Sequence, residues 1–365
     1  MSRFVYFLIA TNMIANIAAS LPRVLLNGSN NGAITSMMLA LVFGVFANWA
    51  LIRLLSSLPG KTLPGLMETY LSKWSFYPLL FFFAINWYVS GLLTLITYSD
   101  ILLRFLTPEM SIYTIVGTFV LFVTFGLLMK SRSVLYTLEI VLVLLIPIIL
   151  YFLLKVYLDR QLDWNNVGVA IMNINSFPSY ILFTASSYVF LGCFDMLYFN
   201  KYVKKKMKFG LKEMLIVGGM GFFILFTTYF VPVGFIGFDG IEDIIYPWIV
   251  TTDSIRMKFG VVERIIFIFL LIFLAIALLN IMIHWHVSLK FFQGALHIDK
   301  LKTSKNKAVA NSILIIAFWT VSIVVAVKIT EYGLFKYVNY FYATLPILFI
   351  LLMGTLIVVK RRANS

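Results

Sequence analysis

The chain has 365 residues, of which 61% are hydrophobic and 12% charged, and its formal net charge is +14. Its mean hydropathy is +0.97, whereas a water-soluble domain would have about twice that charged fraction. This composition excludes an ordinary soluble protein. It predicts an all-α polytopic membrane protein, with residues 1–365 forming one integral domain in the lipid bilayer. The basic residues lie in short loops between apolar runs, which argues against a nucleic-acid-binding surface.

Ten apolar runs are long enough to cross about 30 Å of hydrocarbon as helices. The run at the N-terminus lacks a cleavage site and is predicted as the first span instead of a removed signal. The stretch IIYPWIV at 244–250 is too short to cross, so we expect it in the interface or in a small external helix. The ten predicted spans cover 4–26, 33–55, 76–99, 111–129, 134–156, 177–199, 213–236, 261–284, 308–328 and 337–359.

Lysine and arginine are distributed unevenly between the two sets of loops. With the N-terminus inside, the cytoplasmic positions hold most of the 29 basic residues, including the lysine runs within 201–212 and 290–307. The outer loop 239–253 is acidic instead. We therefore expect both termini in the cytoplasm. The lysines after the sixth span form a cytoplasmic stop, which could additionally bind anionic lipid or an acidic partner.

The ten spans divide into two sets of five, about 4–156 and 177–359, whose first spans share an unusual composition. Small and polar residues interrupt both, in TNMIANIAASLPR at 11–23 and SFPSYILFTASSYVFLGC at 176–193. Such segments at matching places are typical of inverted-repeat transporters, whose discontinuous helices hold a substrate near the midplane. Unwound backbone persists in lipid only where a ligand, ion, water or protein replaces the lost hydrogen bonds. For each single residue, close helix packing remains the alternative interpretation.

Ionisable residues within spans are costly unless paired or hydrated. Glu139 is expected to form an ion pair at the cytoplasmic edge with Arg132 or Lys130. Asp195 lies near the inner end of the sixth span, and we expect it to pair with the neighbouring lysine loop, with a proton relay as the alternative. Glu263 and Arg264 begin the eighth span and are expected to tie it to a neighbour or to the outer loop.

The sequence favours neither a metal site nor an enzyme. Two histidines, His284 and His286, are spaced i, i+2 and face different sides of a helix, with no cysteine or carboxylate one turn away. Cys193 is the only cysteine, so one chain can form no disulfide. No phosphate loop, nucleophile elbow or paired carboxylates at catalytic spacing occur. We therefore expect no catalytic residue, no metal and no cofactor.

Four motifs in the same order resemble those of the B-subunit membrane proteins of bacterial spore germinant receptors. They are SLPR at 20–23, FLG at 190–192 with the lysine run behind it, IYP at 245–247 and VVER at 261–264. This family is a branch of the amino acid–polyamine–organocation transporter superfamily, and the similarity runs through most of the chain. The chain departs from the pattern where Ala15, Asn16 and Ile17 replace glycines of span one, and where Phe194 replaces a glutamate after FLG.

The resemblance implies a ligand-sensing subunit with the LeuT-like 5+5 inverted-repeat fold, in which helices 1 and 6 are broken. It implies residence in the inner membrane of a dormant spore, with an A-type membrane subunit and a C-type lipoprotein as partners. Its ligand would be a small nutrient, and we expect an amino acid because helix N-termini exposed by a break favour a carboxylate. Binding would shift a conformational equilibrium that the partners convert into ion release.

We expect the ligand between spans one, three, six and eight, bound by broken-helix backbone of 15–18 and 187–192 and by nearby side chains. Mid-span Asn86 and Trp87 could line the same cavity. The expected ligand-binding residues are Asn12, Ala15, Asn16, Ile17, Ala18, Asn86, Trp87, Ser186, Ser187, Phe190, Leu191 and Gly192. The expected structural or coupling residues are Pro22, Asp195, Pro247, Glu263 and Arg264.

Two other functions remain open at the level of sequence. The first is a secondary active transporter that carries an amino acid or related solute with H⁺ or Na⁺. Few carboxylates lie in mid-membrane, which disfavours proton coupling, but backbone carbonyls and hydroxyls such as those of Ser186 and Ser187 can hold Na⁺. The second is a purely structural membrane subunit, which no ligand would stabilise.

Overall fold

The computed structural model describes residues 2–203, 206–256 and 264–364. In these ranges the regular secondary structure is helical, which confirms the predicted all-α class. The α-helices are α1 (Arg3–Ala18), α2 (Leu21–Asn27), α3 (Ala33–Leu55), α4 (Leu63–Tyr70), α5 (Lys73–Phe105), α6 (Ile112–Leu128), α7 (Ser131–Tyr157), α8 (Trp164–Ile171), α9 (Tyr180–Tyr188), α10 (Met196–Phe199), α11 (Leu211–Ile236), α12 (Pro247–Ser254), α13 (Ile265–Ala295), α14 (Ser304–Lys328) and α15 (Glu331–Asn364). Five 3₁₀ segments connect or extend them, namely η1 (Met172–Asn175), η2 (Val189–Asp195), η3 (Asn200–Tyr202), η4 (Ile241–Asp243) and η5 (Ile298–Lys300).

Within the described ranges, eight helical segments are long and apolar enough to cross a membrane. A ninth span results if α1 and α2 are taken together, although they are bent by 55° at their junction. The apolar helix α6 has 17 residues and is slightly shorter than the rest. Each of the ten predicted apolar runs falls on one of these segments, so the protein has many apolar helices of membrane-spanning character.

The eighth predicted run has the wrong inner boundary. Helix α13 continues to Ala295, eleven residues beyond the predicted end, and its first residue is Ile265. Polar residues lower the hydropathy after position 284, but two of them bond backbone carbonyls of the neighbouring helix α5. The Ser288 hydroxyl donates to the Ala84 carbonyl at 2.7 Å, and the Trp285 indole donates to the Tyr88 carbonyl at 3.1 Å. Polar side chains that find backbone acceptors on a packed partner can therefore extend a buried helix.

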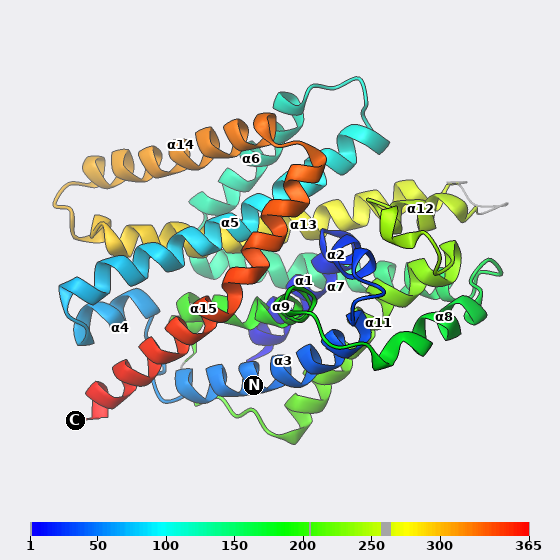
Figure 1. The fold of residues 1–365 in the computed structure, drawn as a ribbon. Coiled ribbons are helices and arrows are strands. Elements are labelled where there is room, and N and C mark those ends of the chain that lie inside the picture. The colour runs from blue at the N-terminus through cyan, green and yellow to red at the C-terminus, as the bar shows by residue number, and fades with distance from the viewer. Residues whose placement is uncertain (1, 204–205, 257–263, 365) are drawn as a thin grey trace.

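The long helices α5 and α13 pack side by side through the middle of the molecule (Figure 1). Helix α1 lies against η2 and also contacts α11 and α13, while α3 packs on α9 and α11. Helices α14 and α6 pack together beside the central pair, and α15 crosses the bundle obliquely, in contact with α9, α5 and α4 (Figure 1). One continuous apolar core joins these elements.

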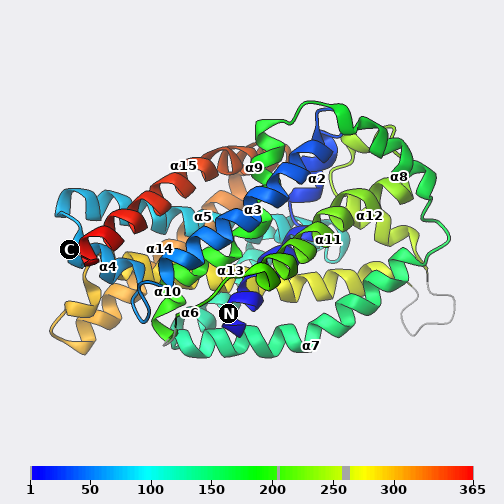
Figure 2. The same ribbon diagram turned by 90° about the horizontal axis from the view of Figure 1, so that it is seen from below.

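Different helices lie at the two ends of the bundle. Figure 2 shows α4, the end of α13 and the C-terminus of α15 together at one end. There the Arg362 guanidinium donates to the Tyr70 carbonyl at 2.6 Å, and Lys300 pairs with Glu68. Lys201, Lys290 and Lys300 belong to this end, which corresponds to the expected cytoplasmic side. Helices α2 and α12 and the last turn of α5 lie at the opposite end.

Candidate functional site

The first span is interrupted between α1 and α2, at Ala19 and Ser20. Proline has no N–H and its ring clashes with the carbonyl four residues earlier, so Pro22 cannot continue a helix through Ala18. Instead Pro22 occupies the first turn of α2. The backbone of 15–18, which we expected to unwind, is helical, and the break lies directly after it. The Ser20 hydroxyl is hydrogen-bonded to the Thr97 hydroxyl of α5 at 2.9 Å.

The sixth span changes from α-helix to 3₁₀-helix at Val189 and keeps this form to Asp195. A 3₁₀-helix has poorer hydrogen-bond geometry, which leaves its carbonyls accessible to other donors. Two asparagines from neighbouring helices use them. The Asn12 amide donates to the Tyr188 and Val189 carbonyls at 2.7 and 3.1 Å, and the Asn48 amide donates to the Phe190 carbonyl at 3.1 Å.

Asn12 is the centre of a buried polar cluster between α1, η2 and α13. Its own carbonyl accepts the Asn16 amide at 2.7 Å, and its side-chain oxygen accepts the Asn280 amide at 3.3 Å. One turn further along α13, the ring of His284 is hydrogen-bonded to the Asn280 carbonyl at 2.8 Å. Asparagine satisfies three partners here because it carries both donors and acceptors. The cluster therefore fixes α1 against the irregular part of the sixth span.

Asp195 ends the 3₁₀ segment and is only 2% exposed. The Trp87 indole of α5 donates to its carboxylate at 2.7 Å. The expected pairing with the lysine loop is wrong for the described residues, because the side chain turns inward to α5. Burial of a carboxylate without a cationic partner is costly, so Asp195 is a chemically distinctive group of the core.

Two small cavities lie beside this cluster. The first has a volume of about 30 Å³ and is lined by residues of α5, the sixth span, α13 and α15. The second, of about 20 Å³, extends toward the break of the first span at Ala19 and Ser20. Ser90 and Tyr188 line both cavities, and their hydroxyls are hydrogen-bonded at 2.5 Å. Cavities of this size hold about one or two water molecules each, so the core is too tightly packed in this state to hold an amino acid.

The cavities lie among predicted spans one, three, six and eight, with α15 as an additional wall. Of the predicted ligand-binding residues, Asn86, Trp87 and Leu191 line the first cavity and Asn16 lines the second. The others are buried but line neither cavity, namely Asn12, Ala15, Ile17, Ala18, Ser186, Ser187, Phe190 and Gly192.

Phe190 and Gly192 have packing roles. A Cβ atom on Gly44 or Gly221 would collide with the Phe190 ring, so this ring fills a slot between α3 and α11. A Cβ atom on Gly192 would meet the Leu8 carbonyl and would lie 2.8 Å from the Asn12 Cβ atom. The glycine is therefore what allows η2 to approach α1 so closely.

Sequence reasoning missed Ser90, Tyr188, His284 and Phe341 as cavity residues. Ser90 follows Asn86 by four residues, which places both on one face of α5. This spacing in an otherwise apolar span was a usable signal. No sequence signal marked Phe341, since an aromatic residue in an apolar run has the same pattern whether it faces lipid or a cavity.

A larger crevice of about 550 Å³ lies between α5, α14 and α15. Its lining is mostly aliphatic and aromatic, with exposed side chains such as Ile85 and Tyr340. Asn86 and Phe341 line both this crevice and the first closed cavity. These two side chains therefore separate the polar core from the lateral surface of the bundle.

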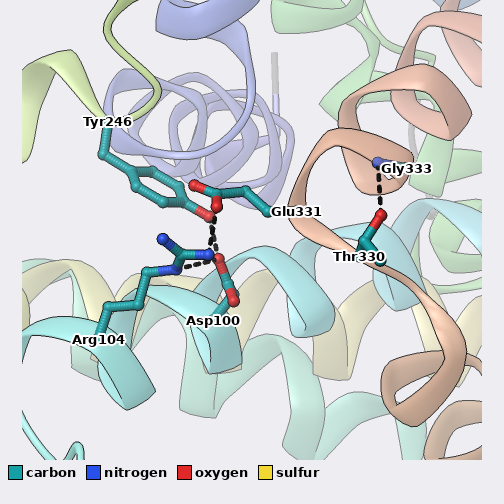
Figure 3. Close-up of polar contacts among 6 residues, drawn as sticks. All are labelled: Asp100, Arg104, Tyr246, Thr330, Glu331 and Gly333. Carbon is teal, nitrogen blue, oxygen red and sulfur yellow. Dashed lines mark hydrogen bonds and ion pairs between the residues drawn. The ribbon is translucent and has the colours of Figure 1, made fainter.

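An ionic network covers the end of the core opposite the lysine-rich end (Figure 3). Arg104 at the end of α5 bonds Asp100 at 3.2 Å and also pairs with Glu331 at the start of α15. The Tyr246 hydroxyl, next to α12, donates to Asp100. Burial and the adjacent carboxylate raise the pKa of the Tyr246 phenol, which keeps it a donor. Nearby, Arg23 of α2 donates to the Glu242 and Ile244 carbonyls.

Replacing Arg104 by glutamine should loosen this network. Since Arg104 is partly exposed, we expect a loss of only about 1 kcal/mol in stability, and 1 M NaCl should lower wild-type stability toward that of the variant. Thermal unfolding of both proteins at low and high salt measures this. Arg160→Gln, at an exposed position near the same end, is the matched control. If the variant were as stable as wild type at low salt, the network would not contribute to the stability of this end of the bundle.

The remaining predicted contacts have mixed outcomes. Glu139 forms an edge ion pair, but with Arg3 at 3.1 Å. The expected partner Arg132 instead donates to Tyr136 at 3.1 Å on its own helix, whereas packing of α1 on α7 brings Arg3 to the carboxylate. Arg264 lies 3.9 Å from Asp253 of the outer loop, and Glu263 lies outside the described residues. Pro247 begins α12, where the short external helix was expected.

Comparison with known protein families places the chain in one of them. The sequence model of a family described as spore germination protein matches residues 1–331 of the chain. No curated protein sequence matches it significantly. The match covers α1 through α14 and therefore includes every element around the polar core except α15, of which it reaches only the first residue.

Proposed function

Because the chain belongs to the spore germination protein family, we propose that it is the ligand-sensing membrane subunit of a spore germinant receptor. The observation that carries this proposal is the meeting of the two irregular spans at one place. The break after Ala18 and the 3₁₀ segment from Val189 adjoin small cavities, and side chains of Asn12 and Asn48 occupy the freed carbonyls. Irregular backbone buried in a bundle is the usual setting for substrate binding in transporter folds.

An amino acid is the ligand that suits these groups best. Its ammonium group would take the place of an amide donor at the Tyr188 and Val189 carbonyls, which accept from Asn12 in the closed state. Its carboxylate would accept from Ser20, Ser90 or Asn16, which line the second cavity. Its side chain would contact the apolar wall of α15. These groups are neutral, and they suit a zwitterion because a zwitterion adds no net charge to the core.

Binding requires the core to expand, since the two cavities hold about 30 and 20 Å³. Ser90 and Tyr188, whose hydroxyls are hydrogen-bonded, line both cavities, and in this proposal breaking that bond joins the cavities into one chamber. A ligand that binds only the expanded state would shift the equilibrium by its differential affinity for the two states. In this proposal the shift is the signal, and helices α15 and α5, which meet in the outer network, would carry it outward.

The proposal includes a ten-span, 5+5 inverted-repeat architecture with both termini in the cytoplasm and the protein in the spore inner membrane. Support comes from the irregular first span of each half, α1–α2 and the segment 180–202, which pack against one another. The lysine-rich segments at one end of the bundle support the orientation. The proposed partners, an A-type membrane subunit and a C-type lipoprotein, follow from the family.

Purification from native spore membranes tests the receptor assignment. A tag placed after Ser365 would allow isolation in mild detergent and identification of co-purifying proteins. We expect A-type and C-type subunits in stoichiometric amounts. A chain that elutes alone under conditions that preserve other membrane complexes would overturn the assignment.

Secondary transport is the second candidate, and Asp195 is the observation that favours it. Its buried carboxylate bonds Trp87, and Trp87 and His284 both line the first cavity. A carboxylate at this place could bind and release a proton as the core opens and closes. Uptake of labelled amino acids into proteoliposomes with an imposed pH gradient tests this. Proton-coupled transport requires gradient-driven uptake that Asp195→Asn abolishes, and no uptake by wild type would exclude it.

A further inference from the structure

A separate polar cavity lies at the lysine-rich end of the bundle, remote from the polar core. Its volume is about 280 Å³, and its walls come from α4, the segment around α10 and η3, the end of α13, and η5. Figure 2 shows α4, α10 and the end of α13 at this end. The lining residues are mostly polar or charged, namely Thr62, Glu68, Tyr198, Lys201, Lys290, Gln293, His297, Asp299 and Lys300, with Pro64, Gly65 and Gly294 between them.

Two of the lysines have only neutral hydrogen-bond partners. The Lys201 ammonium donates to the Tyr198 hydroxyl at 2.6 Å and to the Ser131 hydroxyl at 3.4 Å. The Lys290 ammonium donates to the Gln293 side-chain oxygen at 2.9 Å. Among the described residues, no carboxylate lies within 4.0 Å of either nitrogen. Both side chains are partly buried, so water compensates their charge less fully than at an open surface.

The carboxylates of the lining do not balance these charges. Glu68 is already engaged by Lys300 and by the His297 ring, whose Nδ1 atom lies 3.4 Å from it. Asp299 is then the one carboxylate left for Lys201 and Lys290 within this lining. The lining thus keeps an excess of positive charge even with a neutral histidine.

The walls are also held in place before any ligand arrives. His297 adopts a left-handed backbone conformation with φ of 51°, which is costly for a residue with a side chain. Its ring stacks on Phe76 with centroids 5.8 Å apart and bonds the Tyr77 hydroxyl at 3.0 Å. The first turn of α4, capped by Thr62, also borders the cavity, and its helix dipole adds positive potential.

We propose that this cavity is a binding site for a phosphate-bearing anion, held by Lys201 and Lys290. Lysine is a usual partner of phosphate as a compact charge with three donors. The anion would occupy the space between the inner end of the sixth span and the end of α13, and would thereby link two elements that also border the polar core. The site is independent of the proposed nutrient ligand.

The same chemistry can come from a lipid headgroup or from a soluble phosphate compound. Basic cavities between helices at the cytoplasmic side often hold anionic headgroups. The volume of about 280 Å³ accommodates a single phosphate, a pyrophosphate or the headgroup of phosphatidylglycerol. An experiment with two arms therefore separates the sources.

The soluble arm measures thermal unfolding of the full-length protein in detergent with pyrophosphate against chloride at equal ionic strength. The lipid arm compares nanodiscs of phosphatidylcholine with and without phosphatidylglycerol. We expect stabilisation in at least one arm. Lys201→Met with Lys290→Met should weaken the response about tenfold in apparent affinity. Lys302→Met with Lys305→Met, at exposed positions outside the lining, should leave it unchanged.

A response in the pyrophosphate arm alone would assign a soluble ligand, and one in the phosphatidylglycerol arm alone a lipid. Lys290→Arg keeps the charge and should retain the response, which guards against misfolding of the double methionine variant. The proposal is overturned if neither probe stabilises wild type, or if the Lys201 and Lys290 double variant responds as wild type does. Neither outcome depends on the nutrient-sensing function.

Discussion

Gly192→Val is expected to cause the largest loss of folded protein among the changes considered. The added side chain would collide with the Leu8 backbone carbonyl and with the Asn12 Cβ atom, which would lie only 2.8 Å away. A collision with backbone cannot be relieved by a rotamer change, so α1 must move away from η2. Overpacking of this kind costs about 3 kcal/mol or more. Thermal unfolding and the monodisperse yield in detergent both measure the effect.

Gly219→Val is the matched control for this change. Gly219 lies in α11, and a Cβ atom added there meets nothing within 4 Å. We expect normal yield and stability for this variant. If the two valine variants were equally stable, the close packing of the sixth span on α1 would be refuted. If Gly192→Val also abolished the response to a nutrient ligand, that loss would therefore reflect disturbed packing and would say little about ligand contact.

Asn12→Ala should have the second largest effect. The substitution removes donors from the Tyr188 and Val189 carbonyls and an acceptor from the Asn280 amide. Hydrogen bonds between membrane helices contribute about 0.6 kcal/mol each on average, so three lost bonds predict a loss of about 2 kcal/mol. Chemical or thermal unfolding in detergent would measure it, and the signalling response should fall together with stability.

Asn86→Ala provides the contrast. Among the described residues, the Asn86 amide donates only to the Phe82 carbonyl one turn back on its own helix, at 2.8 Å. Its removal should therefore cost less than about 0.5 kcal/mol. A stability loss as large as that of Asn12→Ala would show that the polar cluster around Asn12 does not hold α1 and η2 together.

Much of the fold could be predicted because lipid imposes strong constraints on sequence. Apolar length located every long helix, and the small and polar residues of 11–23 indicated an irregular first span. The break lies one residue beyond the predicted segment because Pro22 acts on the residue four positions earlier, Ala18. The end of α13 was missed because hydropathy counts the polar face of a helix as exposed, while Trp285 and Ser288 bond to α5.

The candidate site was harder to predict, and the reasons lie in side-chain direction. Composition identified Asn16, Asn86 and Trp87, which line the cavities. It could not show that Phe190 points away from them into a slot at Gly44 and Gly221. Nor could it show that Asp195 turns inward to Trp87, since a carboxylate within two turns of a lysine run has the pattern of an edge ion pair.

The most direct test of the central claim is the thermal stability of the purified protein across a panel of L-amino acids. The proposed function predicts that at least one of them stabilises wild type. It also predicts that Asn86→Leu, which keeps the branched side-chain shape but replaces a polar group of the first cavity with methyl groups, loses most of that shift. Thr118→Val, at an exposed position of α6 whose hydroxyl bonds only its own helix, should keep it. A shift that Asn86→Leu retains in full, or no shift with any amino acid, would contradict an amino-acid site in this core.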